Sequence, residues 1–336
     1  MKHLPADMTL WQGRVDPEDG ERGRRLHQMV TSYTSSCEQG GVVIYGFACD
    51  EGVARNKGRQ GAALAPDTIR QALANFAWHN APALYDGGNI VCDDTDLVLA
   101  QQGLSQHIHQ TLSQHNVLVL GGGHETAWAS FQGLSGYLSR HVSSQKAPKI
   151  GIINFDAHFD LRTPQGISEA GSSGTPFAQI AQLCQQKGWP FNYACLGVSQ
   201  TSNTQALFDK ADQLGCWVED DTEMHIAAIP ALKEKLGKFI QGCDYLYLTL
   251  DMDVFPANAA PGVSAPATIG VPVQVIEPLI QFIFGEADRQ GVRVPVFDIT
   301  EVNPNYDRDQ QTSRLAARMA WTMLHATSHH IDSQGE

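Results

Sequence analysis

The sequence predicts an α/β fold in which helices cover both faces of a mostly parallel, eight-stranded sheet. Two observations predict it: short apolar runs recur along the chain, and segments of helical character alternate with them. Continuous apolar strands are typical of parallel sheets that are buried on both faces, and alternating strands and helices build such sheets. No linker, repeat or low-complexity segment interrupts the pattern, so we expect a single domain over residues 1–336.

The expected elements follow from the positions of these runs. The eight expected strands lie at 41–47, 89–93, 117–120, 149–153, 193–198, 216–218, 245–250 and 292–299. The most distinct helical segments start at 65 or span 97–114, 232–240, 274–289 and 312–325. The proline-rich run 256–266 predicts an irregular loop. Residues 1–38 are polar and contain two helical-looking pieces, which indicates an N-terminal extension packed on the domain.

Composition narrows the classes of function. The 336 residues carry a formal net charge of −13 and no basic cluster, which argues against nucleic acid or an anionic membrane as a partner. There is no apolar leader at the start and no apolar run of membrane-spanning length. Seven scattered cysteines without a Cys-x-x-Cys motif predict free thiols in a reducing cytoplasm. The expected partner is therefore a small molecule.

The strand at 149–153 leads into a segment with ligand-type side chains at alternate positions: Asp156, His158 and Asp160. If the backbone stays extended there, the two-residue period of a strand places all three on one face. Oxygen and nitrogen ligands gathered at a strand end can offer a preorganised site to a metal ion. The alternative is a capped strand end with an aspartate turn, which this segment alone does not exclude.

Three further expected strands end in residues of the same chemical kind. The glycines at 121–123 allow a tight backbone turn that brings His124 to the mouth of the sheet. Asp251 and Asp253 follow another strand two residues apart, and Glu301 follows the last strand. Ligands of open α/β sheets bind beyond the carboxyl ends of the strands, so we expect these side chains to meet there.

Together these segments offer two imidazoles and four carboxylates. The six candidate metal ligands are His124, Asp156, His158, Asp160, Asp251 and Asp253. Six ligands exceed the set of one tetrahedral zinc and suit two divalent cations with shared carboxylates, Mn²⁺ being the expected ion at two per chain. Such a pair can lower the pKa of a shared water from about 15.7 towards neutrality, so no serine or cysteine nucleophile is needed.

Four motifs in a fixed order carry a resemblance to a known family. They are Gly-Gly-Gly-His-Glu at 121–125, Asp-Ala-His-x-Asp at 156–160, Asp-x-Asp at 251–253 and Glu-Val-Asn-Pro at 301–304. Over roughly residues 40–325 the chain resembles the ureohydrolases, which include arginase, agmatinase and formimidoylglutamase. The resemblance implies a three-layer α/β/α fold, a binuclear manganese centre and hydrolysis at a guanidinium or amidine carbon.

The resemblance also implies roles for single residues. The first manganese would be bound by His124, Asp156, Asp160 and Asp251, and the second by Asp156, His158, Asp251 and Asp253. Asp156 and Asp251 would thus bridge the two ions. Glu301 would pair with the cationic amidine nitrogen through a charge-assisted contact. Asp160, or a water on the metal, would pass a proton to the departing nitrogen.

Departures from the arginase pattern indicate a branch of the family. Arg162 stands where arginases have an asparagine, and Phe177 where they have a histidine that helps proton transfer, so the proton donor stays open. Arg162 favours an anionic substrate, because a guanidinium binds a carboxylate bidentately. Together with Asn56 and Arg59 of the cationic loop 51–62, it makes the chain look like the formimidoylglutamases of histidine degradation. That implies hydrolysis of N-formimino-L-glutamate to L-glutamate and formamide.

Alternatives remain open at this level. The chain could be a guanidino hydrolase that releases urea from an agmatine-like or guanidino-acid substrate. It could be a metal-binding scaffold without activity, or, with less support, a deacetylase of the wider arginase fold, although those usually bind a single zinc with fewer ligands. The loop 51–62 could equally be a solvated loop with no ligand, and a homo-oligomer is possible.

Overall fold

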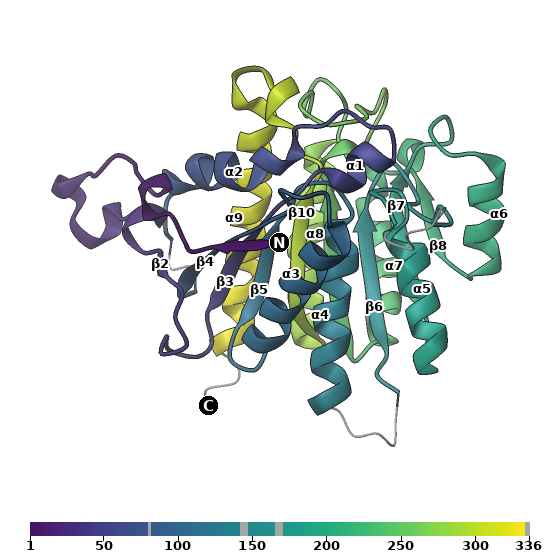
Figure 1. Ribbon diagram of the computed structural model, residues 1–336, viewed down its shortest axis with the longest axis horizontal. Coiled ribbons are helices and arrows are strands. Elements are labelled where there is room, and N and C mark those ends of the chain that lie inside the picture. Colours follow the sequence, from purple (N-terminus) through teal and green to yellow (C-terminus); the bar gives the residue numbers. More distant parts are fainter. Residues whose placement is uncertain (80–81, 142–146, 165–170, 333–336) are drawn as a thin grey trace.

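The computed structural model describes residues 1–79, 82–141, 147–164 and 171–332, with side chains up to residue 327. Its strands are β1 (Lys2–Leu4), β2 (Thr31–Ser32), β3 (Val42–Ala48), β4 (Leu84–Val91), β5 (Asn116–Leu120), β6 (Ile150–Phe155), β7 (Asn192–Val198), β8 (Trp217–Asp220), β9 (Tyr245–Asp251) and β10 (Arg293–Thr300). They form one sheet in the order β1-β4-β3-β5-β10-β9-β6-β7-β8, and β2 pairs with β4 (Figure 1).

The predicted strand count of eight is wrong for the described residues, because the sheet has ten strands. The eight predicted strands are all present and run parallel to one another. The two additional strands come from the N-terminal segment: β1 pairs with β4 antiparallel, and β2 pairs with β4 parallel. Both are short, mostly exposed and without an apolar run, so no sequence signal marks them.

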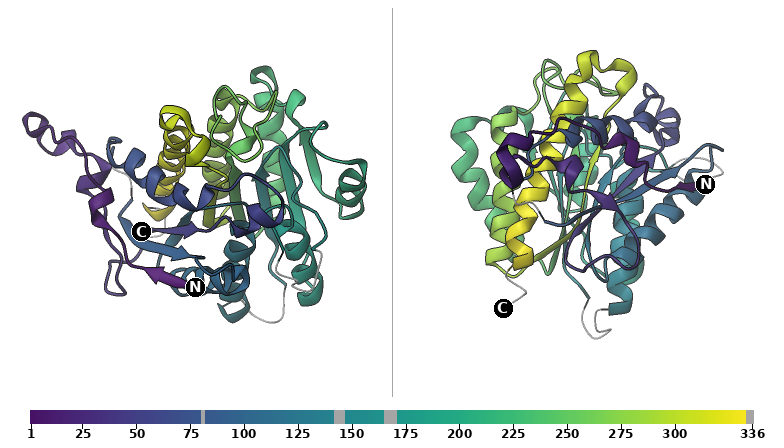
Figure 2. Two further views of the ribbon diagram at one scale, coloured as in Figure 1. Left: turned by 45° about the horizontal axis from the view of Figure 1, so that its top comes forward. Right: turned by 90° about the vertical axis from the view of Figure 1, so that its left-hand side faces the viewer.

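Residues 1–38 form short 3₁₀ helices at Met8–Leu10, Pro17–Gly23 and Leu26–Gln28 in addition to β1 and β2. In Figure 2 this purple segment lies along one edge of the sheet and projects beyond the body of the molecule. Trp11 anchors this segment to the sheet, because its buried Nε1–H donates to Asp86 Oδ2 at 2.7 Å. The extension therefore completes the sheet edge as well as packing on it.

Two layers of helices enclose the sheet. The helices are α1 (Glu51–Arg55), α2 (Ala65–Ala74), α3 (Leu97–Thr111), α4 (Thr126–His141), α5 (Pro176–Lys187), α6 (Gln205–Gln213), α7 (Ile229–Gln241), α8 (Val273–Arg289) and α9 (Gln311–Asp332). On one face α3 packs on α4 and α4 on α5, and on the other α2, α9, α8 and α7 pack in sequence (Figure 1). The three-layer α/β/α prediction is confirmed. Part of the predicted loop 51–62 is helical, since α1 lies in it.

The two cores follow the alternation of side chains along each strand. Val43, Tyr45 and Phe47 of β3 pack with the α3–α5 layer, whereas Val42 and Ile44 pack with the α2, α7, α8 and α9 layer. Every residue of the run Val42–Phe47 is buried, as expected for a parallel strand covered on both faces. Because both faces of the sheet are buried, a ligand can reach the sheet only at the strand ends.

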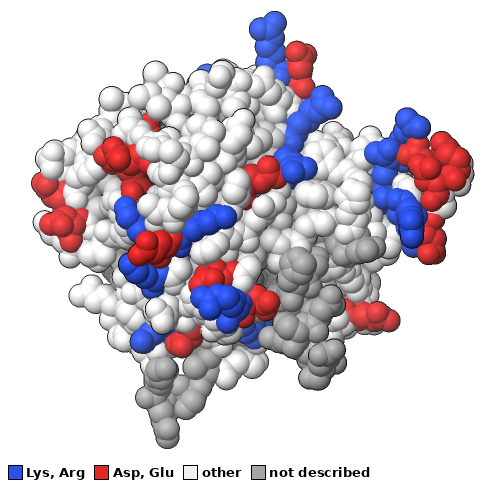
Figure 3. Space-filling model, turned by 180° about the vertical axis from the view of Figure 1, so that it is seen from behind, with Lys and Arg blue, Asp and Glu red and all other residues white. Residues whose placement is uncertain are grey.

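Over the described residues, no helix combines the length and the apolar character needed to cross a membrane. On the face in Figure 3, basic and acidic side chains lie interspersed between broad uncharged areas. The described part of that face therefore presents no continuous basic surface.

The sheet order decides where the motif residues meet. His124 follows β5, Glu301 follows β10, Asp251 ends β9 and Asp156 follows β6. These four strands are neighbours in the centre of the sheet, in the order β5-β10-β9-β6, and all are parallel. Their carboxyl ends therefore lie side by side, although the motifs span about half the chain.

Candidate metal centre and substrate pocket

The glycine-rich turn after β5 fixes the position of His124. Gly122 lies so close to β3 that an added Cβ would come within 1.6 Å of the Cys49 carbonyl oxygen, so only glycine fits. Its N–H donates to Phe47 O at 2.8 Å, and Gly123 N–H donates to Cys49 O at 3.1 Å. The turn is thus fastened to β3 on one side and places the imidazole over the central strands.

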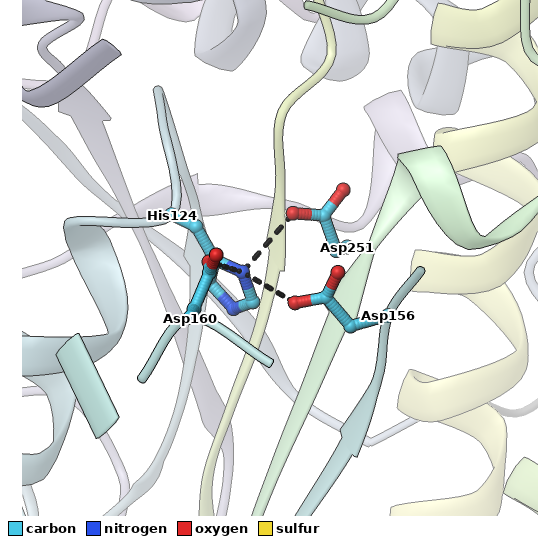
Figure 4. Close-up of side chains that lie close together, drawn as sticks. All are labelled: His124, Asp156, Asp160 and Asp251. Carbon is cyan, nitrogen blue, oxygen red and sulfur yellow. Dashed lines mark ion pairs between the residues drawn. The ribbon is translucent and has the colours of Figure 1, made fainter. Parts of the chain in front are cut away.

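His124 is the centre of a first ligand group. Its Nδ1 lies 3.0 Å from an Oδ2 atom of each of Asp156, Asp160 and Asp251 (Figure 4). The imidazole is 1% exposed, and its Nδ1 has no hydrogen-bond partner among the described residues. On the other side of the ring, Nε2 lies 3.0 Å from Thr249 Oγ1. A proton held on Nε2 by Thr249 would leave the Nδ1 lone pair directed at the three carboxylates, the arrangement of a metal-binding histidine.

A second ligand group overlaps the first. His158 Nδ1 lies 3.0 Å from Asp253 Oδ2 and 3.6 Å from Asp156 Oδ1. Within each group, the ligand atoms all lie within 4.8 Å of one another, and Asp156 belongs to both. Asp251 belongs only to the first group. Its other oxygen, Oδ1, accepts the Asp253 N–H at 2.8 Å. Asp156 is therefore the residue that the two groups share, and the bridging roles of Asp156 and Asp251 stay predictions.

Turns, rather than extended backbone, bring these side chains together. The extended backbone considered for 156–160 is not present, and the alternative of an aspartate turn holds: β6 ends at Phe155, and Asp160 has the left-handed φ of +47°. Asp156 Oδ1 accepts the His158 N–H at 2.6 Å, and Asp253 lies in a 3₁₀ turn rather than on a continued strand. Aspartate stabilises such turns because its short carboxylate accepts the backbone N–H two residues on.

The group of four aspartates is electrostatically crowded. Burial, followed by the charge of Asp156, raises the pKa of Asp160 to about 6. Burial, followed by the charges of Asp253 and Asp156, raises the pKa of Asp251 well above its ordinary value. Burial alone would lower the pKa of His124, but its three aspartate partners raise it. In the described part of the chain these carboxylates form ion pairs only with the two histidines. Divalent cations would relieve this repulsion, so the donor set fits a metal centre.

Glu301 stands beside this cluster in a strained conformation. Its φ is +66°, which is uncommon outside glycine, and strain of this kind concentrates at functional sites. Its Oε1 accepts the His124 N–H at 2.8 Å, so Glu301 also orients the histidine-bearing turn. Burial, followed by the charges of Glu125 and Asp253, raises its pKa well above the ordinary value. A bound cation would favour its ionised form.

A cavity of about 330 Å³ opens above the cluster, and we call it the metal pocket. The candidate metal ligands that line it are His158, Asp160, Asp251 and Asp253, and Glu301 lines it as well. Asn56, Lys57, Arg59, Arg162 and Ser173 also line it. The structure therefore brings the predicted ligands and the predicted substrate residues to one pocket.

The predicted substrate residues differ in whether their side chains already have hydrogen-bond or ion-pair partners. The Arg162 side chain is exposed and passes over Gly174, and its guanidinium has no hydrogen bond or ion pair among the described residues. Asn56 is also exposed, and its Nδ2 donates to Ser173 Oγ at 3.2 Å. An unpaired guanidinium at the pocket is available to a carboxylate ligand.

Arg59 is engaged elsewhere. Its Nε donates to Ser264 O at 2.9 Å, its NH2 donates to Val263 O at 2.5 Å, and the guanidinium lies 4.0 Å above the Tyr306 ring. Arg59 thus fastens the loop 256–266 over the pocket. Its predicted role in binding a substrate carboxylate stays a prediction that this geometry does not favour.

Phe177 forms part of the wall behind the metal ligands. It is fully buried, packs edge-on against His124 at 5.3 Å between ring centroids, and stacks on Tyr193 at 4.4 Å. A phenyl ring carries no exchangeable proton. Proton transfer to the leaving group must therefore come from another residue or from water.

Comparisons with known proteins agree with this architecture. The family model described as "Arginase family" matches residues 40–326. The chain belongs to the arginase family. This match confirms the resemblance that the four motifs indicate.

Named relatives of this arginase-family chain include a formimidoylglutamase of Aliivibrio fischeri, 53% identical over 95% of both chains. The crystal structure of Bacillus subtilis formimidoylglutamase matches with a TM-score of 0.76 at 24% identity, covering 90% of this chain and 92% of that one. The structure of Trypanosoma cruzi formiminoglutamase with Mn²⁺ matches with a TM-score of 0.73 at 23% identity, covering 91% and 98%. The arginase-family fold and the two overlapping ligand groups together support a binuclear metal centre.

Two residues that support the candidate metal centre carry no signal in the sequence. Thr249 orients His124 from within β9. Asn203 braces the turn between two predicted ligands: its Oδ1 accepts the Phe159 N–H at 3.1 Å, and its Nδ2 donates to Ala157 O at 2.9 Å. A threonine in a strand and an asparagine in a loop are common, so only the fold reveals what they contact.

Proposed function

We propose that this arginase-family protein is a formimidoylglutamase that hydrolyses N-formimino-L-glutamate to L-glutamate and formamide in histidine degradation. The observation that carries the proposal is the 53% identity, over 95% of both chains, to a relative named formimidoylglutamase. The Arg162 guanidinium, which has no partner among the described residues, supports it, because it shares the metal pocket with the ligand groups and suits an anionic substrate. The seven free cysteines agree with the expected cytoplasmic location.

We assign two Mn²⁺ ions to the metal centre. His124, Asp156, Asp160 and Asp251 would hold one, and Asp156, His158 and Asp253 the other, with Asp251 as a second bridge. Imidazole and carboxylate donors suit Mn²⁺, and the Trypanosoma cruzi formiminoglutamase of this fold was solved with it. When bound, the ions acidify a water and so supply a nucleophile near neutral pH.

The remaining steps fall to the side chains of the metal pocket. We propose that Glu301 pairs with the amidinium of the substrate, which its position in the pocket lining beside the ligands supports. Arg162 holds a substrate carboxylate and so fixes the orientation of the reacting carbon. Asp160 is our candidate to pass a proton to the departing glutamate nitrogen, since Phe177 offers none.

Product analysis tests the proposed reaction. Manganese-loaded protein is incubated separately with N-formimino-L-glutamate, arginine, agmatine and guanidinobutyrate, and formamide and urea are quantified. We expect formamide from formiminoglutamate and at most trace urea from the guanidino compounds. Urea as the main product would replace the proposal with a guanidino hydrolase. No product from any of the four compounds would instead favour a metal-binding scaffold.

Arg162→Ala tests the recognition of the substrate carboxylate. Loss of a charged partner from a partly desolvated site costs about 2–5 kcal/mol, and Arg162 is exposed, so we expect the lower end. The value of kcat/KM for formiminoglutamate should therefore fall at least about tenfold, at about 1.4 kcal/mol per decade. The bound metal should be unchanged, because Arg162 is not a ligand.

The control for this variant is Arg22→Ala, which removes an exposed arginine of the N-terminal extension outside the pocket. It should keep wild-type kinetics. Arg162→Lys keeps the charge but not the bidentate fork, so it should restore only part of the activity. Wild-type kcat/KM in Arg162→Ala would contradict a role for Arg162 in substrate binding.

A further inference from the structure

A second cavity, of about 760 Å³, adjoins the metal pocket, and we call it the vestibule. The two share four lining residues: Asn56, Lys57, Arg162 and Leu207. Basic side chains line the vestibule at Arg55, Lys57, Arg162 and Lys210, and none of the described lining residues is acidic. This composition is unusual in a chain with 36 acidic and 23 Lys or Arg residues. The vestibule would therefore attract an anion although the chain as a whole carries a net charge of −13.

Among the cations that line the vestibule, Lys210 is the one whose partial burial is not balanced by an ion pair with a described residue. It is half-buried on α6, and its Nζ donates to Thr163 Oγ1 at 3.1 Å. Over the described residues it forms no ion pair with a carboxylate, and burial lowers its pKa. Arg55, by contrast, is paired with Glu51 at 2.9 Å. A partly buried ammonium without a counter-ion is costly unless an anionic ligand completes the site.

Helix α6 adds a second positive feature to the same wall. The cap residue Thr204, Ala206 and Leu207 of its first turn line the vestibule, and Lys210 follows one turn later. The Thr204 side chain makes no capping hydrogen bond to the helix. The first N–H groups of a helix carry partial positive charge and favour a nearby anion. The dipole of α6 and the Lys210 ammonium therefore act on the same space.

We propose that the vestibule is the subsite for the second carboxylate, that of the side chain, of a dianionic substrate, with Lys210 as the specificity-determining cation. This inference rests on the proposed function and names how that function selects its substrate. Formiminoglutamate carries two carboxylates, and Arg162, which lines both cavities, can pair with only one of them bidentately. Arg59 is bound to two backbone carbonyls and is not free to serve the other. Lys57 also lines both cavities without a carboxylate partner among the described residues, but it is exposed, whereas Lys210 is half-buried and contacts Thr163, the neighbour of Arg162.

The experiment compares two substrates that differ in one charge. N-formimino-L-glutamine replaces the side-chain carboxylate of formiminoglutamate by a neutral amide of similar size. In Lys210→Met we expect kcat/KM for formiminoglutamate to fall at least about tenfold, while kcat/KM for the glutamine analogue stays near the wild-type value. The inhibition constant of L-glutamate, the proposed product, should rise by a similar factor. Metal content and melting temperature should not change.

Lys187→Met is the matched control. The Lys187 ammonium also donates to a hydroxyl, Ser139 Oγ at 2.9 Å, but it lines neither cavity. This variant should keep wild-type kinetics on both substrates. If Lys210→Met fails to fold, Lys210→Gln keeps a hydrogen-bond donor to Thr163 without the charge and is expected to show the same selective loss.

The outcomes separate this inference from the proposed function. A wild-type enzyme that does not hydrolyse formiminoglutamate overturns the proposed function and the inference together. An active wild type with unchanged selectivity in the folded Lys210 variant overturns the inference alone. An equal loss on both substrates also overturns it, because Lys210 would then act on something other than the second carboxylate.

Discussion

Asp156→Ala is expected to release most of both metal ions and to abolish hydrolysis. Asp156 is the residue shared by the two ligand groups, with one oxygen 3.0 Å from His124 Nδ1 and the other 3.6 Å from His158 Nδ1. Loss of a group that merely supports a metal ligand costs about 10- to 100-fold in metal affinity. Loss of a ligand shared by two ions should cost more than about 100-fold for the centre as a whole.

Elemental analysis after manganese loading and dialysis measures this effect. We expect about two ions per chain in the wild type and well below one in Asp156→Ala. Asp253→Ala is the comparison, because Asp253 belongs to the second group only, so the ion of the first group should be retained. Two ions in Asp156→Ala would contradict its bridging role, and one ion with full activity in the wild type would contradict a binuclear centre.

Thermal unfolding distinguishes a metal ligand from a structural residue. Without metal, Asp156→Ala should be less stable than the wild type, because Asp156 accepts the His158 N–H at 2.6 Å and the Asn154 side-chain N–H at 2.9 Å. With metal, the wild type should gain about 2.7 kcal/mol at a free ion concentration of 100 times its Kd, and the variant should gain little. Equal stabilisation of both proteins by Mn²⁺ would exclude the assigned role.

The predictable part of the fold is the part whose signal lies within a few consecutive residues. The apolar runs of β3, β5 and β9 are buried on both faces, so their sequence alone identifies them. β1 and β2 are short and largely exposed, and their pairing with β4 satisfies backbone groups without a pattern of side chains. No local signal could have added them to the eight predicted strands.

The candidate metal ligands were predictable for a similar reason, because short motifs mark them. Which cations are free to bind a substrate was not predictable. The motifs place His124, Asp156 and Asp251 at strand ends, and parallel pairing of β5, β10, β9 and β6 brings them together. Whether a cationic side chain is available to a ligand depends on its contacts with residues distant in the sequence. Arg59 is held by Ser264 and Lys210 contacts Thr163, and no local pattern in the sequence indicates either contact.

Glu301→Gln is expected to lower kcat/KM for formiminoglutamate by roughly 30- to 4,000-fold, which corresponds to the 2–5 kcal/mol of a lost buried charge partner. Glutamine is an informative substitution because it removes the charge and keeps the shape of the side chain. Its amide oxygen can still accept the His124 N–H that Glu301 Oε1 now accepts at 2.8 Å, and it tolerates the φ of +66° as well as glutamate does. The turn that carries His124 should therefore stay in place, and only the negative charge facing the metal pocket is removed.

The measurement pairs steady-state kinetics with metal content. We expect the variant to retain its metal and its melting temperature while kcat/KM falls, which separates loss of the amidinium partner from damage to the centre. Glu125→Gln is the control: Glu125 is equally buried and accepts a backbone N–H, from Gly52 at 2.9 Å, but it does not line the metal pocket. It should keep most of the activity.

A Glu301→Gln enzyme with wild-type kcat/KM would show that the amidinium finds its counter-charge elsewhere, on the metal-bound carboxylates themselves. Loss of metal in this variant would make Glu301 a support for His124 rather than a partner of the substrate.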